Sequence, residues 1–101
     1  MTNLLVRAQL LQVVMLLERH PDLRVINVSI SSYVSVDGAE PTPTVQLRTL
    51  APLIAAYPGV ALRAEIGGGL HRHMLVDGVD FVDIVPYTPE QLSTLAAQVS
   101  A

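Results

Sequence analysis

The feature that most constrains the fold is an alternation of apolar and polar side chains over residues 24–36. From residue 26 onward one parity is apolar except for Ser32, and it comprises Ile26, Val28, Ile30, Val34 and Val36. The other parity is polar except for Val25, and it comprises Asn27, Ser29, Ser31, Tyr33 and Ser35. Successive side chains of a β-strand point to opposite faces of its sheet. The stretch therefore predicts a long strand with one buried face and one solvated face.

The segment before this strand predicts a helix over residues 3–20. It contains strong helix formers and neither Gly nor Pro, and Pro21 ends it. Apolar side chains occupy almost every angular position, and a helix of that kind is usually buried on more than one side. One side can cover the sheet of its own chain, so we expect the other side to meet a second copy. The residues assigned to that interface are Leu4, Leu5, Ala8, Leu11 and Met15.

The rest of the chain carries short strand and helix signals in turn. Period-two runs at residues 44–48, 60–66 and 70–76 predict strands, and one apolar stripe at 50–57 predicts a short helix capped by Thr49. Residues 79–85 are apolar on both parities, which indicates a central strand or a bulge.

Two turn signals connect these strands. Asp77-Gly78 predicts a two-residue hairpin between residues 70–76 and 79–85. Three consecutive glycines, residues 67–69, predict a flexible hairpin tip rather than a phosphate-binding loop, because a strand and not a helix follows them.

The C-terminal segment predicts a last helix. Thr88 and Gln91 have the spacing of a capping box, and Pro89 occupies the favoured first helical position. Its apolar stripe consists of Leu92, Leu95, Ala96 and Val99.

These elements define a single α+β domain over residues 1–101, in the order α-β-β-α-β-β-β-α. We expect a mostly antiparallel sheet of four to five strands with helices packed on one face. The hairpin of residues 24–36 with 44–48 is expected at the centre of the sheet. Its predicted core residues are Ile26, Val28, Ile30, Val45 and Leu47.

The composition and charge of the chain limit the kinds of partner that it can bind. Half of the residues are hydrophobic and only 15% are charged, against about 25% in an average domain, which favours a homo-oligomer, most simply a dimer. The net charge is −3, and the arginines Arg24, Arg48, Arg63 and Arg72 are dispersed along the chain, which disfavours nucleic acid as a partner. The sequence leaves open that Arg24, Arg48 and Arg63 converge on one sheet edge. The absence of Cys excludes disulfides and thiolate metal sites.

No targeting signal is evident. The apolar run of residues 10–17 is shorter than the ~20 residues that span a bilayer, and no small-residue cleavage site follows it. We therefore expect a cytoplasmic protein with no membrane partner.

One cluster of residues is a candidate metal site. On a strand, His71 and His73 point the same way, and two imidazoles can bind zinc together with a carboxylate such as Asp80 or Asp83 from the neighbouring strand. The competing interpretation is a solvated face beside a glycine turn. Because no longer ligand motif supports the site, we expect no obligatory metal, no cofactor and no catalytic residue.

The chain resembles small αββαββ proteins of unassigned function from actinobacteria and their phages. The resemblance rests on the helix that ends in ERHPD, the alternating strand, the VQLRTLAPLIAA step and the strand pair around VDGVDFVDIV. It covers most of the chain as a pattern of elements and implies no activity or catalytic residue. What it implies is a phage or mobile-element accessory protein that binds a host protein.

Two functions follow. The first is a small non-enzymatic protein-interaction module that self-associates and binds a protein partner still to be identified. The second is a small metal-binding protein or enzyme that uses His71, His73 and a nearby Asp.

Overall fold

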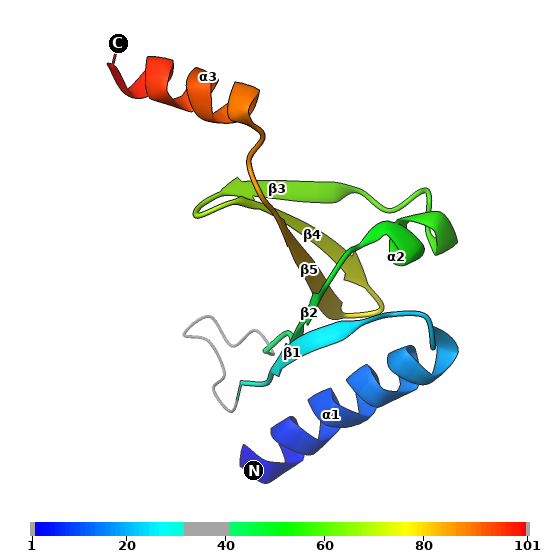
Figure 1. Ribbon diagram of the computed structural model, residues 1–101. Helices are drawn as coiled ribbons and strands as arrows, with labels where there is room; N and C mark the ends of the chain where they lie inside the picture. The colour runs from blue at the N-terminus through cyan, green and yellow to red at the C-terminus, as the bar shows by residue number, and fades with distance from the viewer. Residues whose placement is uncertain (1, 32–40, 101) are drawn as a thin grey trace.

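The computed structural model describes residues 2–31 and 41–100 and confirms the predicted fold class and order of elements (Figure 1). The elements are α1 (Thr2–Arg19), β1 (Val25–Ser29), β2 (Thr44–Leu47), α2 (Ala51–Ala56), β3 (Leu62–Ile66), β4 (Leu70–Val76), β5 (Val79–Val85) and α3 (Pro89–Ser100). No helix in these ranges combines the length and apolarity that crossing a membrane requires.

The five strands form one sheet in the order β1-β2-β5-β4-β3. Neighbouring strands are antiparallel except for β2 and β5, which are parallel. The central strand is β5, as its apolar side chains on both parities indicated, and both Phe81 and Val82 are buried.

The prediction that the hairpin of residues 24–36 forms the centre of the sheet is wrong, because β1 is an edge strand. Within the described residues the strand ends at Ser29, and residues 32–36 lie outside the described part of the chain. Ile26 and Val28 are 58% and 37% exposed, so their assignment to the core is also wrong. Ile30 packs partly against the core, and the buried positions predicted on β2, Val45 and Leu47, are confirmed.

A β-bulge in β1 explains why the alternation of apolar and polar residues predicted the wrong buried positions. Val25 pairs with Leu47 while Asn27 pairs with Gln46, so Ile26 is an extra residue on β1 with no counterpart on β2. A bulge interrupts the two-residue period. Pairing places Val25 and Val28 opposite the buried side chains of β2, yet they remain 40% and 37% exposed at the sheet edge.

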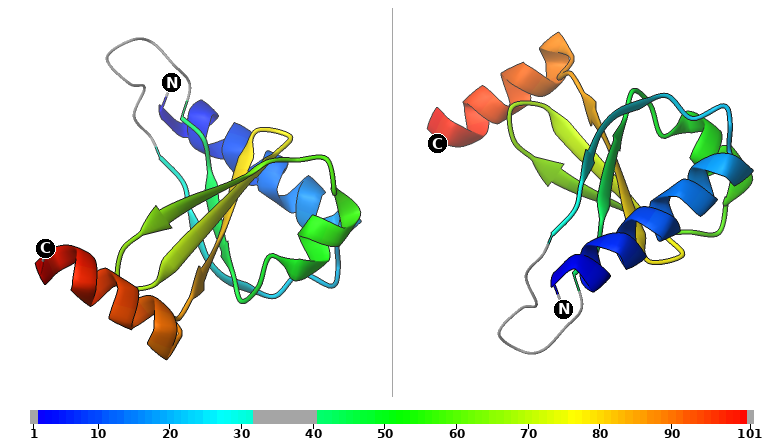
Figure 2. Two further views of the ribbon diagram at one scale, coloured as in Figure 1. Left: turned by 90° about the horizontal axis from the view of Figure 1, so that it is seen from above. Right: turned by 90° about the horizontal axis from the view of Figure 1, so that it is seen from below.

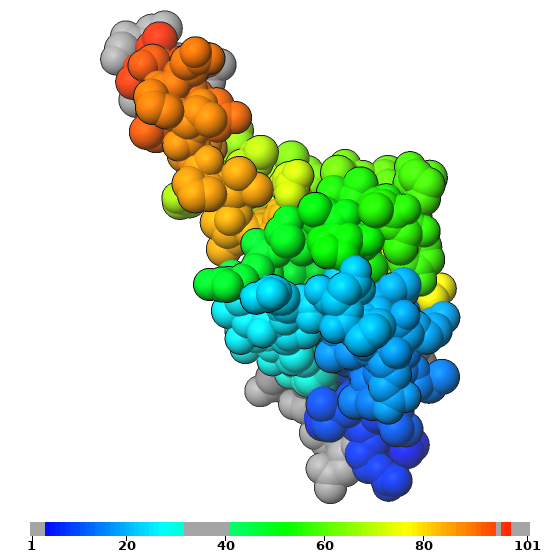
Figure 3. All heavy atoms as spheres, turned by 45° about the vertical axis from the view of Figure 1, so that its right-hand side comes forward, coloured from blue at the N-terminus to red at the C-terminus, as the bar shows by residue number. Residues whose placement is uncertain are grey.

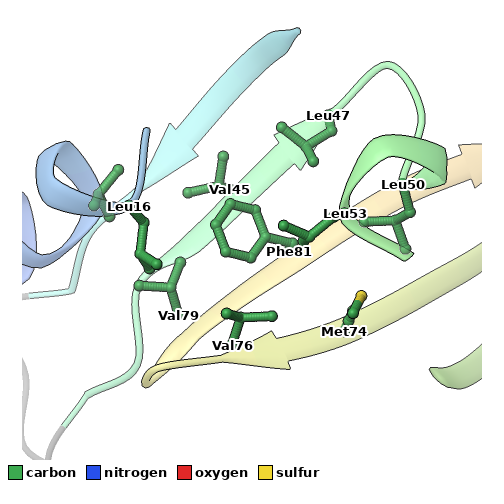
Figure 4. Packing of buried hydrophobic residues seen from close by; sticks show 10 residues of the cluster. Leu16, Val45, Leu47, Leu50, Leu53, Met74, Val76, Val79 and Phe81 are labelled. Atoms are coloured by element: carbon green, nitrogen blue, oxygen red, sulfur yellow. The ribbon is translucent and has the colours of Figure 1, made fainter. Parts of the chain in front are cut away.

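The core lies between the sheet and the two helices α1 and α2. Figure 4 shows Phe81 of β5 surrounded by apolar side chains of both helices and of the neighbouring strands. The cluster comprises Val13, Leu16, Val45, Leu47, Leu50, Leu53, Met74, Val76, Val79 and Phe81. The covered face of the sheet carries the even-numbered residues of β4 and the odd-numbered residues of β5.

Hydrogen bonds from two glutamines fix α1 to the sheet. The buried Gln9 side chain donates to the Ser31 carbonyl at 2.5 Å and accepts from the Ser31 amide at 3.3 Å. Gln12 donates to the Asp77 carbonyl at 2.7 Å. The turn that receives this bond needs glycine, because Gly78 has a φ of 78° and a Cβ there would collide with the Gln12 amide.

The edge strand β3 is covered on neither face. Leu62, Ala64 and Ile66 point to the helix-covered side, as their parity predicted, but they are exposed because neither α1 nor α2 reaches them. Alternation over residues 60–66 assigns Val60, Leu62, Ala64 and Ile66 to one inward face; Val60 packs partly against the core, but the burial expected of the other three is wrong.

The last helix, α3, begins at the predicted capping box. The Thr88 amide donates to Gln91 Oε1 at 2.9 Å, and the Gln91 amide donates to Thr88 Oγ1 at 3.1 Å. The helix projects from the end of β5, away from α1 and α2 (Figures 1 and 2). The radius of gyration is consequently 16.0 Å, larger than the about 13 Å of a compact domain of this size.

Candidate functional site

Four ionisable side chains gather on the sheet face opposite the helices, and we call them the polar cluster: Arg63, Glu65, His73 and Asp80. They come from β3, β4 and β5. His73 Nδ1 lies 3.0 Å from Asp80 Oδ2, and His73 Nε2 lies 3.7 Å from Glu65 Oε2. Arg63 Nη2 lies 3.7 Å from Asp80 Oδ1, so opposite charges alternate around the cluster when His73 is protonated.

Strand pairing brings the polar cluster together. His73 lies directly opposite Arg63 on β3, and it is a diagonal neighbour of Asp80 across β4 and β5. Diagonal neighbours are within reach of long side chains. The His73 and Asp80 side chains are only 14% and 16% exposed, whereas those of Arg63 and Glu65 are 64% and 63% exposed.

The chemistry open to the polar cluster is that of an oriented imidazole. A carboxylate that accepts a hydrogen bond from Nδ1–H leaves Nε2 as the basic nitrogen, which is how a general base is positioned. Here Nε2 is buried and faces the Glu65 carboxylate, and among the described residues neither it nor Asp80 Oδ1 has a hydrogen-bond partner. The described side chains place no Ser or Thr hydroxyl in hydrogen-bond contact with His73. The geometry therefore matches a series of ion pairs across three strands better than a nucleophile with its general base.

A second charged pair lies on the covered face. Arg72 donates from Nε to Asp83 Oδ1 at 2.9 Å and from Nη2 to Asp83 Oδ2 at 2.5 Å, a bidentate contact. The Leu50 amide, at the start of α2, donates to Asp83 Oδ2 at 2.8 Å. Thr49, predicted to cap α2, only accepts from the Ala51 amide, and Asp83 is the group that ties the helix start to the sheet.

These contacts keep Asp83 ionised. Its burial opposes ionisation, but hydrogen bonds from Arg72 and the Leu50 amide outweigh burial and hold the pKa of Asp83 below its ordinary value. The hydrogen bond to Asp83 raises the pKa of Arg72. The pair is therefore a structural anchor, and its acceptor oxygens are already engaged by Arg72 and Leu50.

The four candidate metal ligands do not converge. His73 and Asp80 are in contact, but Asp83 lies on the opposite face of β5 and is paired with Arg72. His71 lies against the backbone of Gly67, where a Cβ would be 3.2 Å from its Nε2. Within residues 2–31 and 41–100, no group of three His, Asp or Glu side chains is arranged to hold a metal ion.

The arginines do not form a basic surface. Arg24 and Arg48 lie together at the β1 edge, where the Arg48 amide donates to the Arg24 carbonyl, whereas Arg63 lies on β3 at the other edge. Arg63 and Arg72 are each paired with an aspartate. The three glycines join β3 to β4, so they connect two strands as predicted.

The clearest unpartnered surface is the outer face of α1. The inner face carries the buried side chains Gln9, Val13 and Leu16. Of the predicted interface residues, Leu5 is half-buried and the other four are exposed, with Leu4, Leu11 and Met15 each more than 60% exposed. We call Leu4, Ala8, Leu11 and Met15 the α1 stripe. In Figure 3 α1, drawn in blue, lies at the surface of the molecule.

Comparison of the chain with protein-family models, with curated proteins and with solved structures found no match.

Proposed function

We propose that this chain is a small non-enzymatic interaction module that self-associates through the α1 stripe. The observation that carries the proposal is the exposure of Leu4, Leu11 and Met15 on a helix whose other side is already buried in the core. Soluble monomers rarely expose large contiguous apolar patches, and those that occur commonly mark interfaces.

The spacing of the α1 stripe fits a helix partner. Its residues follow one another at intervals of four, three and four, which is the a/d spacing of a coiled-coil seam. A second copy of α1 presents the same seam, and a two-fold axis between them makes the contact self-complementary.

An antiparallel arrangement of the two helices suits these side chains. It places Ala8 opposite Leu11 of the second copy and Leu4 opposite Met15, so the small Ala8 faces a large side chain. A parallel arrangement would set Ala8 against Ala8 and leave a gap between bulkier layers. Alternating large and small residues across an interface fills it more evenly.

The energy of this contact predicts a moderate affinity. Burying the exposed parts of Leu4, Leu11 and Met15 on both copies gains roughly 5–11 kcal/mol. Association costs about 4–15 kcal/mol of translational and rotational freedom. At the favourable ends of both ranges the net is about −7 kcal/mol, so this contact supports a dimer no tighter than roughly 10 micromolar.

Sedimentation velocity over a concentration series tests the proposal. Leu11→Lys puts a charge into the seam of both copies, and we expect it to weaken association roughly 100-fold or more. The matched control is Leu75→Lys, because Leu75 is 55% exposed, similar to the 61% of Leu11, and lies on the other face of the sheet. A wild-type protein that stays monomeric, or a Leu11→Lys protein that associates like the control, would contradict the proposal.

The resemblance to phage and actinobacterial proteins supports a host protein as an additional partner. Host proteins captured by the wild-type chain but not by the Leu11→Lys variant are partners that need the α1 stripe.

The alternative is a metal-binding protein or enzyme that uses His71, His73 and a nearby Asp, and of these side chains the structure brings His73 and Asp80 within 3.0 Å. Its test is metal analysis of protein purified without a histidine tag. Stoichiometric zinc that disappears in His73→Ala and Asp80→Ala, but not in His20→Ala, would favour this alternative.

A further inference from the structure

A second apolar surface lies on the helix-covered side of the sheet, over β3. We call Leu62, Ala64 and Ile66 the β3 face. Strand pairing places Leu62 beside the buried Met74 and Ala64 beside Arg72, so the β3 face continues the surface that α1 and α2 cover elsewhere. Leu62 is nevertheless 44% exposed and Ile66 is 72% exposed. The helical layer thus ends before the edge of its sheet.

The described side chains of α3 cover no part of the sheet. The described apolar side chains on α3, Leu92, Ala96 and Ala97, are exposed, with Leu92 at 52%. Figures 1 and 3 show α3 standing off from the body of the molecule. A helix of this length without tertiary contacts is marginal in water, because most helical stability in proteins comes from packing of an apolar face.

We propose that α3 of a second copy packs on the β3 face, and that the contact is reciprocal. The dimensions agree, because the 12 residues of α3 span about 18 Å as a helix and the five residues of β3 span about 17 Å as a strand. The β3 face has no charge, and the only charged residue of α3, Glu90, is in its first turn. The exchanged helix adds a third member to the helical layer, beside α2.

The local structure at the start of α3 explains why the helix acts on another copy rather than on its own chain. Tyr87 donates from its hydroxyl to the Gly67 carbonyl at 3.1 Å, which ties the linker to the β3–β4 turn. The linker is short, residues 86–88, and Pro86 and Pro89 restrict its backbone. Reversal onto its own β3 would require a sharp turn within these three residues.

This contact goes beyond the α1 contact and rests on the proposal that the chain self-associates. Because the two contacts use different surfaces, two two-fold interfaces on one chain produce assemblies larger than a dimer. We expect wild-type protein to form dimers and tetramers with rising concentration. Leu11→Lys leaves the dimer formed by α3 exchange, Leu92→Lys leaves the dimer formed by α1, and the double variant is monomeric.

These four proteins separate the two proposals by sedimentation. If only the α1 contact is wrong, Leu11→Lys behaves as wild type and Leu92→Lys dissociates. If only the α3 contact is wrong, Leu92→Lys behaves as wild type and Leu11→Lys dissociates.

Cross-linking tests the α3 contact directly, because the natural chain has no Cys. An Ile66→Cys protein is mixed with a Leu92→Cys protein and treated with a short bis-maleimide. We expect a covalent heterodimer, and we expect none when Leu75→Cys replaces Ile66→Cys. If the mixture gives no heterodimer, or if a chain with both cysteines links only within itself, the proposed exchange is refuted.

Discussion

Replacing Asp83 by Ala tests whether one buried carboxylate joins α2 to the centre of the sheet. The side chain is 1% exposed and accepts two hydrogen bonds from Arg72 and one from the Leu50 amide. The substitution removes all three bonds. It leaves a guanidinium that is 29% exposed and an amide on a residue that is fully buried.

The expected loss of stability follows from the two groups left without a hydrogen-bond partner, the Arg72 guanidinium and the Leu50 amide. Removing one partner of a buried ion pair costs about 3–5 kcal/mol, and the partial exposure of Arg72 places its share at the lower end. A buried amide without an acceptor costs about 1–3 kcal/mol. We expect a total loss of about 4–5 kcal/mol, against a whole stability of about 5–15 kcal/mol for a domain of this size. Asp83→Asn retains an acceptor for the Leu50 amide and should lose about half as much.

Urea unfolding followed by circular dichroism, at one fixed protein concentration, measures these losses. The control is Asp80→Asn on the same strand, because its Arg63 contact is 3.7 Å long and Asn retains an oxygen facing His73, so the change should cost less than Asp83→Asn. A double-mutant cycle with Arg72→Met and Asp83→Asn should give a coupling of at least about 1 kcal/mol. A loss below about 1 kcal/mol in Asp83→Ala, or no coupling in the cycle, would refute the anchoring role.

Three further predictions follow from the same contacts. Because folding lowers the pKa of Asp83, its contribution to stability is complete above the unfolded value of about 3.9 and is lost as pH falls through the lower folded value, so the stability gap between wild type and Asp83→Asn should narrow as the pH of an acid titration is lowered below about 4. Gly78→Ala should lower stability by about 1–2 kcal/mol in urea unfolding, because of the positive φ and the approach of Gln12, whereas Gly59→Ala, which meets nothing within 4 Å, should not; equal effects would contradict the prediction. Val45→Ala should lower the free energy of unfolding by about 2–4 kcal/mol in thermal unfolding, and Val28→Ala by less than about 1 kcal/mol. A larger loss in Val28→Ala than in Val45→Ala would show that β1 contributes to the core.

Much of the fold was predictable because local signals agreed with the tertiary structure. Asp77-Gly78 fixes a two-residue hairpin, and both residues adopt positive φ values of 48° and 78°. The hairpin register then pairs residues whose numbers sum to 155, which places Arg72 opposite Asp83. This signal was available in the sequence and would have identified the buried ion pair, and it would have removed Asp83 from the set of candidate metal ligands.

The place of β1 could not be predicted in the same way. Alternation reports which side chains share a face, but it does not report strand order or whether a helix reaches that face. The bulge at Ile26 changes the parity, and the parallel pairing of β2 with β5 makes β5 rather than β1 the centre. The polar cluster was predicted only in part, because the sequence placed His73 near Asp80, whereas its Arg63 and Glu65 neighbours depend on the β3–β4 register, which the three glycines do not fix.

The apolar surfaces of this chain bear on its stability as well as on its assembly. The α1 stripe, the β3 face and the exposed side chains of α3 are presented together only by the folded chain. Contacts that bind the folded state and not the unfolded state stabilise folding by mass action. The melting temperature of the wild type should therefore rise with protein concentration, whereas that of the Leu11→Lys and Leu92→Lys double variant should not. A melting temperature that is independent of concentration in both proteins would show that these surfaces have no partner in a second copy.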